Sequence, residues 1–193
     1  MQLLTFWLLV LHTLVFCPQA RGGYTHYFTW HQTPDEAAIK KCVAEMRLII
    51  LTRTNILAGA NDADSPLVLE ESRVDLNGIG DDAHEPFVFP GRPGFNFCKT
   101  AYKPYDEVVT ACLIVARDHF PPSALAISSD GAWEDWDNGA KLYASVLKRP
   151  ARDPMGAAFG SQIIPRTAGQ LAACAVLILA FGVGWYIKKH RGY

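Results

Sequence analysis

Residues 24–30 read Tyr-Thr-His-Tyr-Phe-Thr-Trp, and this run of aromatic and β-branched side chains predicts a β-strand. Residues 33–36 then read Thr-Pro-Asp-Glu, which matches the capping box of a helix N-terminus with proline in the first helical position. Apolar residues recur at helical spacing from Ile39 to Ile50, so we expect a helix that ends near Leu57. The domain therefore opens with a strand that leads directly into a helix.

The elements after this helix complete a recognisable order. Alternation and helical spacing predict a strand at 68–76, a strand at 87–98 that Pro90–Gly94 interrupts, a helix from Pro104, a strand at 125–128 and a helix at 139–147. The order β-α-β-β-α-β is that of ferredoxin-like folds, in which two helices cover one face of a four-stranded antiparallel sheet. We expect an α+β, ferredoxin-like sandwich with the first and third strands at its centre and one additional C-terminal helix.

The C-terminal part of the chain carries a long apolar run. Residues 168–187 contain no formal charge over 20 positions, and basic residues follow at once in the tail 188–193. A helix of this length matches the hydrocarbon thickness of a bilayer. We therefore expect a single transmembrane helix at 168–187, joined to the domain by a Pro- and Gly-containing linker at 151–167, so that the lipid bilayer is one partner of the chain.

A second, shorter apolar run lies at the start of the chain. Residues 3–16 have the length of a signal-peptide core, so residues 1–22 are interpreted as a signal peptide or, alternatively, as an uncleaved N-terminal signal anchor. Together with the basic tail, this favours a type I membrane protein whose domain at 24–150 lies outside the cytoplasm. The alternative is a tail-anchored protein with a cytosolic domain, which requires that residues 1–22 are not a targeting signal.

The charge of the whole chain hides a contrast between its parts. The formal net charge is −1, but residues 24–150 hold 18 acidic and 12 basic side chains and are therefore strongly acidic, while the flanks are basic. An acidic domain favours basic or cationic partners, including proteins, and excludes a nucleic-acid binder of the strongly basic kind.

Familiar catalytic signatures are absent from the sequence. It contains no Walker A loop, no GxGxxG, no CxxC, no HExxH and no GxSxG motif. The domain keeps Cys42, Cys98 and Cys112, and we expect buried thiols in preference to a Cys42–Cys112 disulfide. No cofactor is expected apart from a possible divalent cation, and whether the chain is an enzyme stays open, with the sequence favouring a non-catalytic protein.

Three segments nevertheless combine side chains that can do chemistry. A hairpin loop carries Asp81, Asp82, His84 and Glu85, which can bind a divalent cation or act as acid and base, or simply form a solvated polar turn. Near the start of the second helix, Lys99, Thr100 and Lys103 can bind an anion or serve as ordinary capping residues.

The third segment is a loop in which Trp133 and Trp136 stand among four acidic residues. Such a loop can contact a cationic or sugar-like group, and the alternative is that both indoles pack over the sheet edge. The leading hypothesis from the sequence is a membrane-anchored binding or interaction domain. The competing hypotheses are a metal-dependent hydrolase that uses the loop at 81–85 and a purely structural membrane component.

Overall fold

A computed structural model describes residues 23–61 and 65–156, which belong to one compact unit ending at Gly156. The segments predicted as signal peptide (1–22), transmembrane helix (168–187) and basic tail (188–193) lie outside the described residues. None of the helices described is both long enough and apolar enough to cross a membrane. Residues 151–156, expected to begin the linker, lie against the domain, because Pro154 is buried and its carbonyl accepts a hydrogen bond of 2.7 Å from Arg117 Nε.

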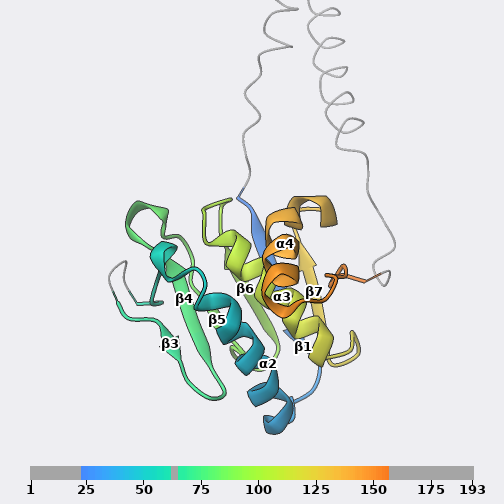
Figure 1. The fold of residues 1–193 in the computed structure, drawn as a ribbon. Helices are drawn as coiled ribbons and strands as arrows, with labels where there is room; N and C mark the ends of the chain where they lie inside the picture. The colour runs from blue at the N-terminus through green and yellow to red at the C-terminus, as the bar shows by residue number, and fades with distance from the viewer. Residues whose placement is uncertain (1–22, 62–64, 157–193) are drawn as a thin grey trace, which may run out of the picture. The chain divides into compact units, whose positions relative to one another are not determined.

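The described residues form a mixed α+β fold, as predicted (Figure 1). Its three α-helices are α2 (Glu36–Ile50), α3 (Asp106–His119) and α4 (Asp137–Leu147). Its strands are β1 (Thr25–Trp30), β2 (Leu57–Ala58), β3 (Val68–Leu69), β4 (Val74–Gly78), β5 (Phe87–Phe89), β6 (Phe95–Lys99) and β7 (Leu125–Ser129). Short 3-10 turns η1 (Thr54–Ile56), η2 (Gly80–Asp82) and η3 (Trp133–Trp136) connect them.

The strands pair in two small antiparallel sheets, whereas a single four-stranded sheet was expected. One sheet has the order β6-β1-β7, and the other has the order β2-β4-β3 with β5 also paired to β4. The strand predicted at 68–76 is a hairpin, because Glu70 N donates to Arg73 O and β3 folds back on β4. The central position of β1 is as predicted, but that of the third strand is not, because its two halves, β5 and β6, each pair with one strand only.

The strand predicted at 87–98 divides into β5 and β6, which pair in different sheets. The dividing segment holds Pro90 and Pro93, which lack the N–H needed for a sheet ladder. It also holds Gly91 and Gly94, whose φ angles of +74° and +81° are readily adopted only by glycine. The chain therefore turns between the two halves, and each half finds its own partner strand.

Helix α2 begins and ends at other residues than predicted. Its N-cap is Asp35, not Thr33, and the Asp35 carboxylate accepts a hydrogen bond of 2.9 Å from Ala38 N. An aspartate is at least as good an N-cap as threonine, which explains the shift of two residues. The helix ends at Ile50, because the next residues form η1 and then β2. Helix α4 begins at Asp137, two residues before the predicted start.

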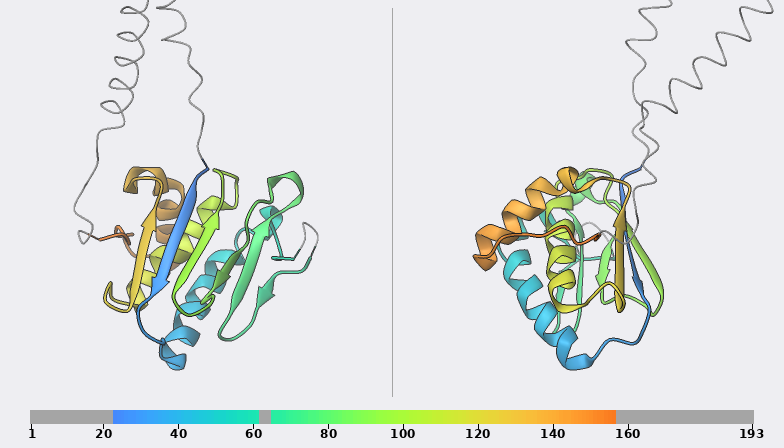
Figure 2. Two further views of the ribbon diagram at one scale, coloured as in Figure 1. Left: turned by 180° about the vertical axis from the view of Figure 1, so that it is seen from behind. Right: turned by 90° about the vertical axis from the view of Figure 1, so that its right-hand side faces the viewer.

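The helices all lie on one side of the sheets (Figure 2). Helix α3 is the central one, and every residue from Val108 to Ala116 is buried. On β1 the residues alternate, so that His26, Phe28 and Trp30 face the helices. The apolar core cluster runs from Phe28 to Tyr143 with partly buried residues as far as Met155, so residues 23–156 contain all of the apolar packing described. The other side of the β6-β1-β7 sheet has no helix upon it among the described residues (Figure 2).

Candidate functional site

The loop predicted to bind a metal does not gather its acidic side chains. Asp81 and Asp82 lie in η2, where Lys103 Nζ is 2.9 Å from Asp81 O and 3.9 Å from Asp82 Oδ1. Glu85 points to β6 instead, and its carboxylate accepts a hydrogen bond of 3.0 Å from Lys99 N. Over residues 23–61 and 65–156, no group of three or more His, Cys, Asp or Glu side chains could hold a metal ion. The metal site, which also included His84, therefore stays a prediction without a ligand set.

The residues predicted to bind an anion are drawn into contacts within the domain. Thr100 is buried, and its hydroxyl donates to Asp106 Oδ1 at 2.5 Å. The first turn of α3 carries both Asp106 and Glu107, so an anion at this helix end would meet two carboxylates. Lys103 already contacts the η2 loop. Of the two lysines, Lys103 forms an ion pair with Asp82, whereas the Lys99 ammonium forms none with any described residue.

The two tryptophans of η3 differ in exposure. Trp136 is fully buried, and its ring packs edge-to-face on the His26 imidazole with centroids 4.9 Å apart. Trp133 is partly buried against the core, 6.4 Å from Trp136. Trp136 is therefore a packing residue of the interior, which agrees with the alternative that the indoles pack on the sheet. Its indole N–H is also buried without a hydrogen-bond partner among the described residues, for which the fold offers no evident physical reason.

The three cysteines of the domain are free thiols, as predicted, and all are buried. Burial raises the pKa of Cys42, Cys98 and Cys112 above the usual value for a thiol. A thiol that stays protonated is a poor nucleophile. Cys42 and Cys112 therefore act as small apolar groups of the core, while the Cys98 thiol also donates a hydrogen bond of 3.3 Å to Glu85 O.

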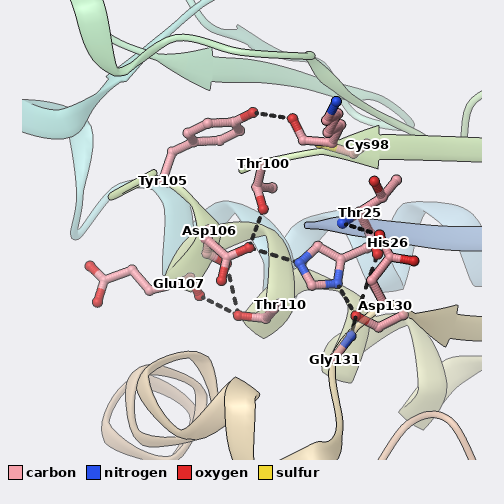
Figure 3. Close-up of polar contacts among 12 residues, drawn as sticks. Thr25, His26, Cys98, Thr100, Tyr105, Asp106, Glu107, Thr110, Asp130 and Gly131 are labelled. Carbon is pink, nitrogen blue, oxygen red and sulfur yellow. Dashed lines mark hydrogen bonds and ion pairs between the residues drawn. The ribbon is translucent and has the colours of Figure 1, made fainter. Parts of the chain in front are cut away.

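A buried hydrogen-bonded network centres on His26 and was not anticipated from the sequence (Figure 3). His26 is fully buried, with Nε2 at 2.7 Å from Asp106 Oδ1 and Nδ1 at 3.1 Å from Ser129 Oγ. Thr100 binds the same carboxylate oxygen, and Gly131 N donates to Ser129 Oγ at 3.1 Å. Because a carboxylate only accepts hydrogen bonds, Nε2 carries a proton, and Nδ1 shares a hydrogen bond with the Ser129 hydroxyl.

The Asp-His-Ser composition of this network is that of a catalytic triad, but its position does not suit catalysis. The His26 ring lies in the interior, enclosed by Trp136 and by the neighbouring Tyr24. A surface pocket of about 360 Å³ is lined by Asp106, yet neither by His26 nor by Ser129. The network does, however, join β1, α3 and β7 through buried polar groups. We assign it the role of satisfying a buried imidazole and fixing these three elements relative to one another.

The uncovered face of the β6-β1-β7 sheet carries a row of aromatic side chains, which we call the open face. Phe95 and Phe97 on β6 are 50% and 48% exposed, whereas Cys98 on the same strand and Phe28 on β1, which face the helices, are buried. Tyr27 on β1 lies beside them, with its ring centroid 5.9 Å from Phe95, and Phe95 is 6.0 Å from Phe97. The Tyr27 hydroxyl donates to Asp130 Oδ1 at 3.1 Å. The three rings thus form one contiguous aromatic surface.

Basic side chains border this aromatic row. Arg92 is exposed just before β6, and Lys99 ends β6 on the same side as Phe95 and Phe97. Neither forms an ion pair with another described residue, whereas Arg73 nearby is held by Asp75 at 2.6 Å. Arg73 and Arg92 also line a shallow basin of about 570 Å³. The local charge of the open face therefore differs from the acidic average of the domain.

Sequence reasoning placed Phe95 and Phe97 in a strand but did not assign them to a face. The signal was present, because Phe95, Phe97 and Lys99 alternate with Cys98, and a cysteine is among the residues most often buried. Comparison of the chain with known protein families, with curated proteins and with solved structures finds no match. The fold and the open face thus define an α+β domain with an uncovered aromatic sheet surface, and its function has to be argued from this surface.

Proposed function

We propose that the chain is a single-pass membrane protein whose α+β domain binds a partner through the open face. The observation that carries this proposal is the half-exposure of Phe95 and Phe97, side by side with Tyr27. Large aromatic side chains are enriched at binding surfaces, because they bury much apolar area while losing few rotatable bonds. Contiguous exposed apolar patches on a domain commonly mark sites of interaction.

The other exposed apolar side chains of the described domain do not form a comparable surface. The other exposed large apolar side chains are Leu48 and Leu51 at the end of α2, Ile79 just before η2 and Tyr102 in the turn after β6. Leu48, Leu51 and Ile79 are aliphatic, and the Tyr102 ring stacks on the buried Tyr24 with centroids 3.8 Å apart, whereas the open face combines three rings in contact. The buried network around His26 is turned inward. Binding by the open face therefore accounts for a feature that folding alone does not require.

The proposed anchor is the apolar run at 168–187, with the basic tail 188–193 in the cytoplasm and the domain on the opposite side. This type I arrangement rests on residues 1–22 acting as a signal peptide and on the position of the basic tail. Reporter fusions after Pro150 and after Tyr193 test it. We expect the two reporters in opposite compartments, and a cytosolic reporter after Pro150 would instead support the tail-anchored alternative.

For the fold we propose a ferredoxin-like core, extended at one edge. The sequence predicts the strands at 68–76 and 87–98 as the second and third of the β-α-β-β-α-β order. We assign these two places instead to β5 and β6, so that the order is β1, α2, β5, β6, α3 and β7, with β2, β3 and β4 as additions next to β5. The hydrogen bond of 3.2 Å from Glu85 N to Lys99 O supports this proposal, because it joins the segments that lead into β5 and out of β6. In the structure β5 and β6 pair in different sheets. Nuclear Overhauser contacts between their backbones would therefore support the ferredoxin-like core, and the absence of such contacts would contradict it.

Hydroxyl-radical footprinting tests the binding function directly. The oxidation of Tyr27, Phe95 and Phe97 is compared between the full chain in its membrane and the fragment 23–156 in solution. We expect these three side chains to be protected in the membrane-bound chain, while Leu48 and Leu51, which are similarly exposed in the fold, are oxidised equally in both samples. Equal oxidation of the open face in both samples would contradict the proposal.

A further inference from the structure

We infer that the partner of the open face is the surface of the bilayer that anchors the chain, with the aromatic rings at the level of the lipid headgroups. This inference rests on the proposed function, and it adds the chemistry of the partner. It combines three observations. They are the aromatic row itself, the bordering basic side chains that form no ion pair among the described residues, and the short length of chain that separates the domain from the apolar run.

The length of chain outside the described residues keeps the domain close to the membrane. After Gly156, only residues 157–167 precede the apolar run at 168–187. Eleven residues span at most about 40 Å even when fully extended. A compact domain of roughly 130 residues has a radius of gyration of about 14 Å, so its diameter is similar to the longest possible tether. The tether therefore holds the domain within about one domain diameter of the bilayer surface.

The side chains of the open face match the chemistry of that surface. Aromatic residues are enriched where a protein contacts the headgroup region, since their rings are apolar and their edges or hydroxyls tolerate water. Tyr27 has this amphipathic character, and Phe95 and Phe97 add apolar area without charge. A flat sheet face presents such rings without inserting backbone into the hydrocarbon, where unpaired peptide groups would be strongly unfavourable.

The charges around the rings favour lipid phosphates. Arg92 and Lys99 lie near the two ends of β6, and neither has a carboxylate partner among the described residues. Basic side chains beside an apolar surface bind the phosphates of lipid headgroups while their methylene groups cover apolar area. Two acidic side chains lie near this face. Asp130 accepts hydrogen bonds from Thr25 N and the Tyr27 hydroxyl at the β7 side, and Glu85 accepts one from Lys99 N at the β6 side. Both carboxylates are thus held by groups of the domain, while the charged ends of Arg92 and Lys99 have no ion pair among the described residues.

The test uses the full chain in nanodiscs of phosphatidylcholine, which contain no other protein. The photo-reactive amino acid benzoylphenylalanine replaces Phe97 in one variant and Leu48 in a second, because the two side chains are similarly exposed, at 48% and 53%. Phe97 belongs to the open face, whereas Leu48 belongs to α2, a helix on the other side of the sheet (Figure 2). After illumination, mass spectrometry identifies the adducts. We expect a lipid adduct at position 97 with a yield several-fold above that at position 48.

Two results would overturn the inference. A lipid yield at position 97 no higher than at position 48 would show that the open face does not rest on the bilayer. An adduct at position 97 to a second copy of the chain would show that a protein covers the face, which contradicts the bilayer as its partner but leaves the proposed binding function intact. Protection of the open face in native membranes without a lipid adduct in nanodiscs would likewise reject only the bilayer as partner.

A pair of charge variants tests the role of the basic side chains. Adding phosphatidylglycerol to the nanodiscs is expected to increase the lipid adduct at position 97, because Arg92 and Lys99 then face more anionic lipid. Arg92→Glu combined with Lys99→Glu should abolish this increase, whereas Lys141→Glu on the exposed side of α4 should preserve it. An increase that survives the double substitution would contradict the assignment of phosphate binding to these two residues.

Discussion

The two faces of the β6-β1-β7 sheet are built from the same three strands and have opposite properties. On the face toward the helices, Phe28 and Trp30 are buried and the His26 imidazole has a partner at each nitrogen. On the opposite face, Phe95 and Phe97 remain half-exposed. Strand geometry directs successive side chains to opposite faces, so one residue of register separates a completed core from an unoccupied surface. The covered face is explained by folding, and the open face needs a second explanation.

The largest effect that separates the two faces is expected from Phe28→Ala. Phe28 is 2% exposed and packs against Phe87 and Phe89, so its truncation leaves a cavity between sheet and helices. Substitutions of this kind lower the free energy of unfolding by about 3–5 kcal/mol. Urea unfolding of residues 23–156, which contain the apolar core as far as the structure describes it, measures the change. A loss below about 1 kcal/mol would contradict the description of this face as the close-packed one.

A somewhat smaller effect is expected from Asp106→Ala, which removes the acceptor that His26 and Thr100 share. Both polar groups would remain buried without a partner, and this lowers the free energy of unfolding by about 2–4 kcal/mol. The matched control is Asp137→Ala, which removes an exposed carboxylate paired with Lys141 and should change stability by less than about 0.5 kcal/mol. Equal effects in the two variants would show that the His26 network does not hold the covered face together.

The sequence predicted the local elements of the covered face well. The strand at 24–30 and the helix after it are present, because β-branched and aromatic residues and a strong N-cap determine them within a few positions. The division between β5 and β6 was visible as an interruption at 90–94. The interruption alone did not predict that the two halves would join different sheets, because the partner strand of each half comes from a distant part of the chain.

The network around His26 could not be predicted from the sequence for a related reason. His26 lies 80 positions from Asp106 and 103 from Ser129, and only the pairing of β1 with β7 and the packing of α3 bring them together. The clusters that the sequence did suggest were local in the chain, such as Asp81 to Glu85. Local spacing does not ensure that side chains converge, and Glu85 turns to Lys99 instead.

A pH-dependent effect tests how the helices on the covered side are held together. Glu45 on α2 binds Arg149 after α4 and His119 at the end of α3. Burial by itself would raise the pKa of Glu45, but the hydrogen bonds from Arg149 and His119 lower it overall. The charged carboxylate therefore stabilises the fold above its unfolded pKa of about 4.3, and this stabilisation is lost as the pH falls through the lower folded pKa.

We accordingly expect Glu45→Gln to lower the free energy of unfolding by about 1 kcal/mol at neutral pH and by progressively less below pH ~4, as the wild-type carboxylate becomes protonated. Urea unfolding of both proteins across this range measures the difference. Glu36→Gln, at an exposed position of the same helix, should have almost no effect at any of these values. A difference that persists unchanged in acid would show that the charge of Glu45 is not what joins the helices.

The smallest effect on the free energy of unfolding is expected from Phe97→Ala. A change this small is the most direct test of whether the open face contributes to folding. A side chain that is half-exposed has little apolar contact to lose, so the free energy of unfolding of the fragment 23–156 should fall by no more than about 0.5–1 kcal/mol. The same substitution placed on the covered face, Phe28→Ala, is expected to be several times more destabilising. If Phe97→Ala instead proved as harmful as Phe28→Ala, Phe97 would be required for folding, and its exposure would no longer call for a partner. If it is nearly neutral, as the geometry indicates, then the aromatic row contributes little to the isolated domain, and its value to the protein must lie in what it contacts outside the fold.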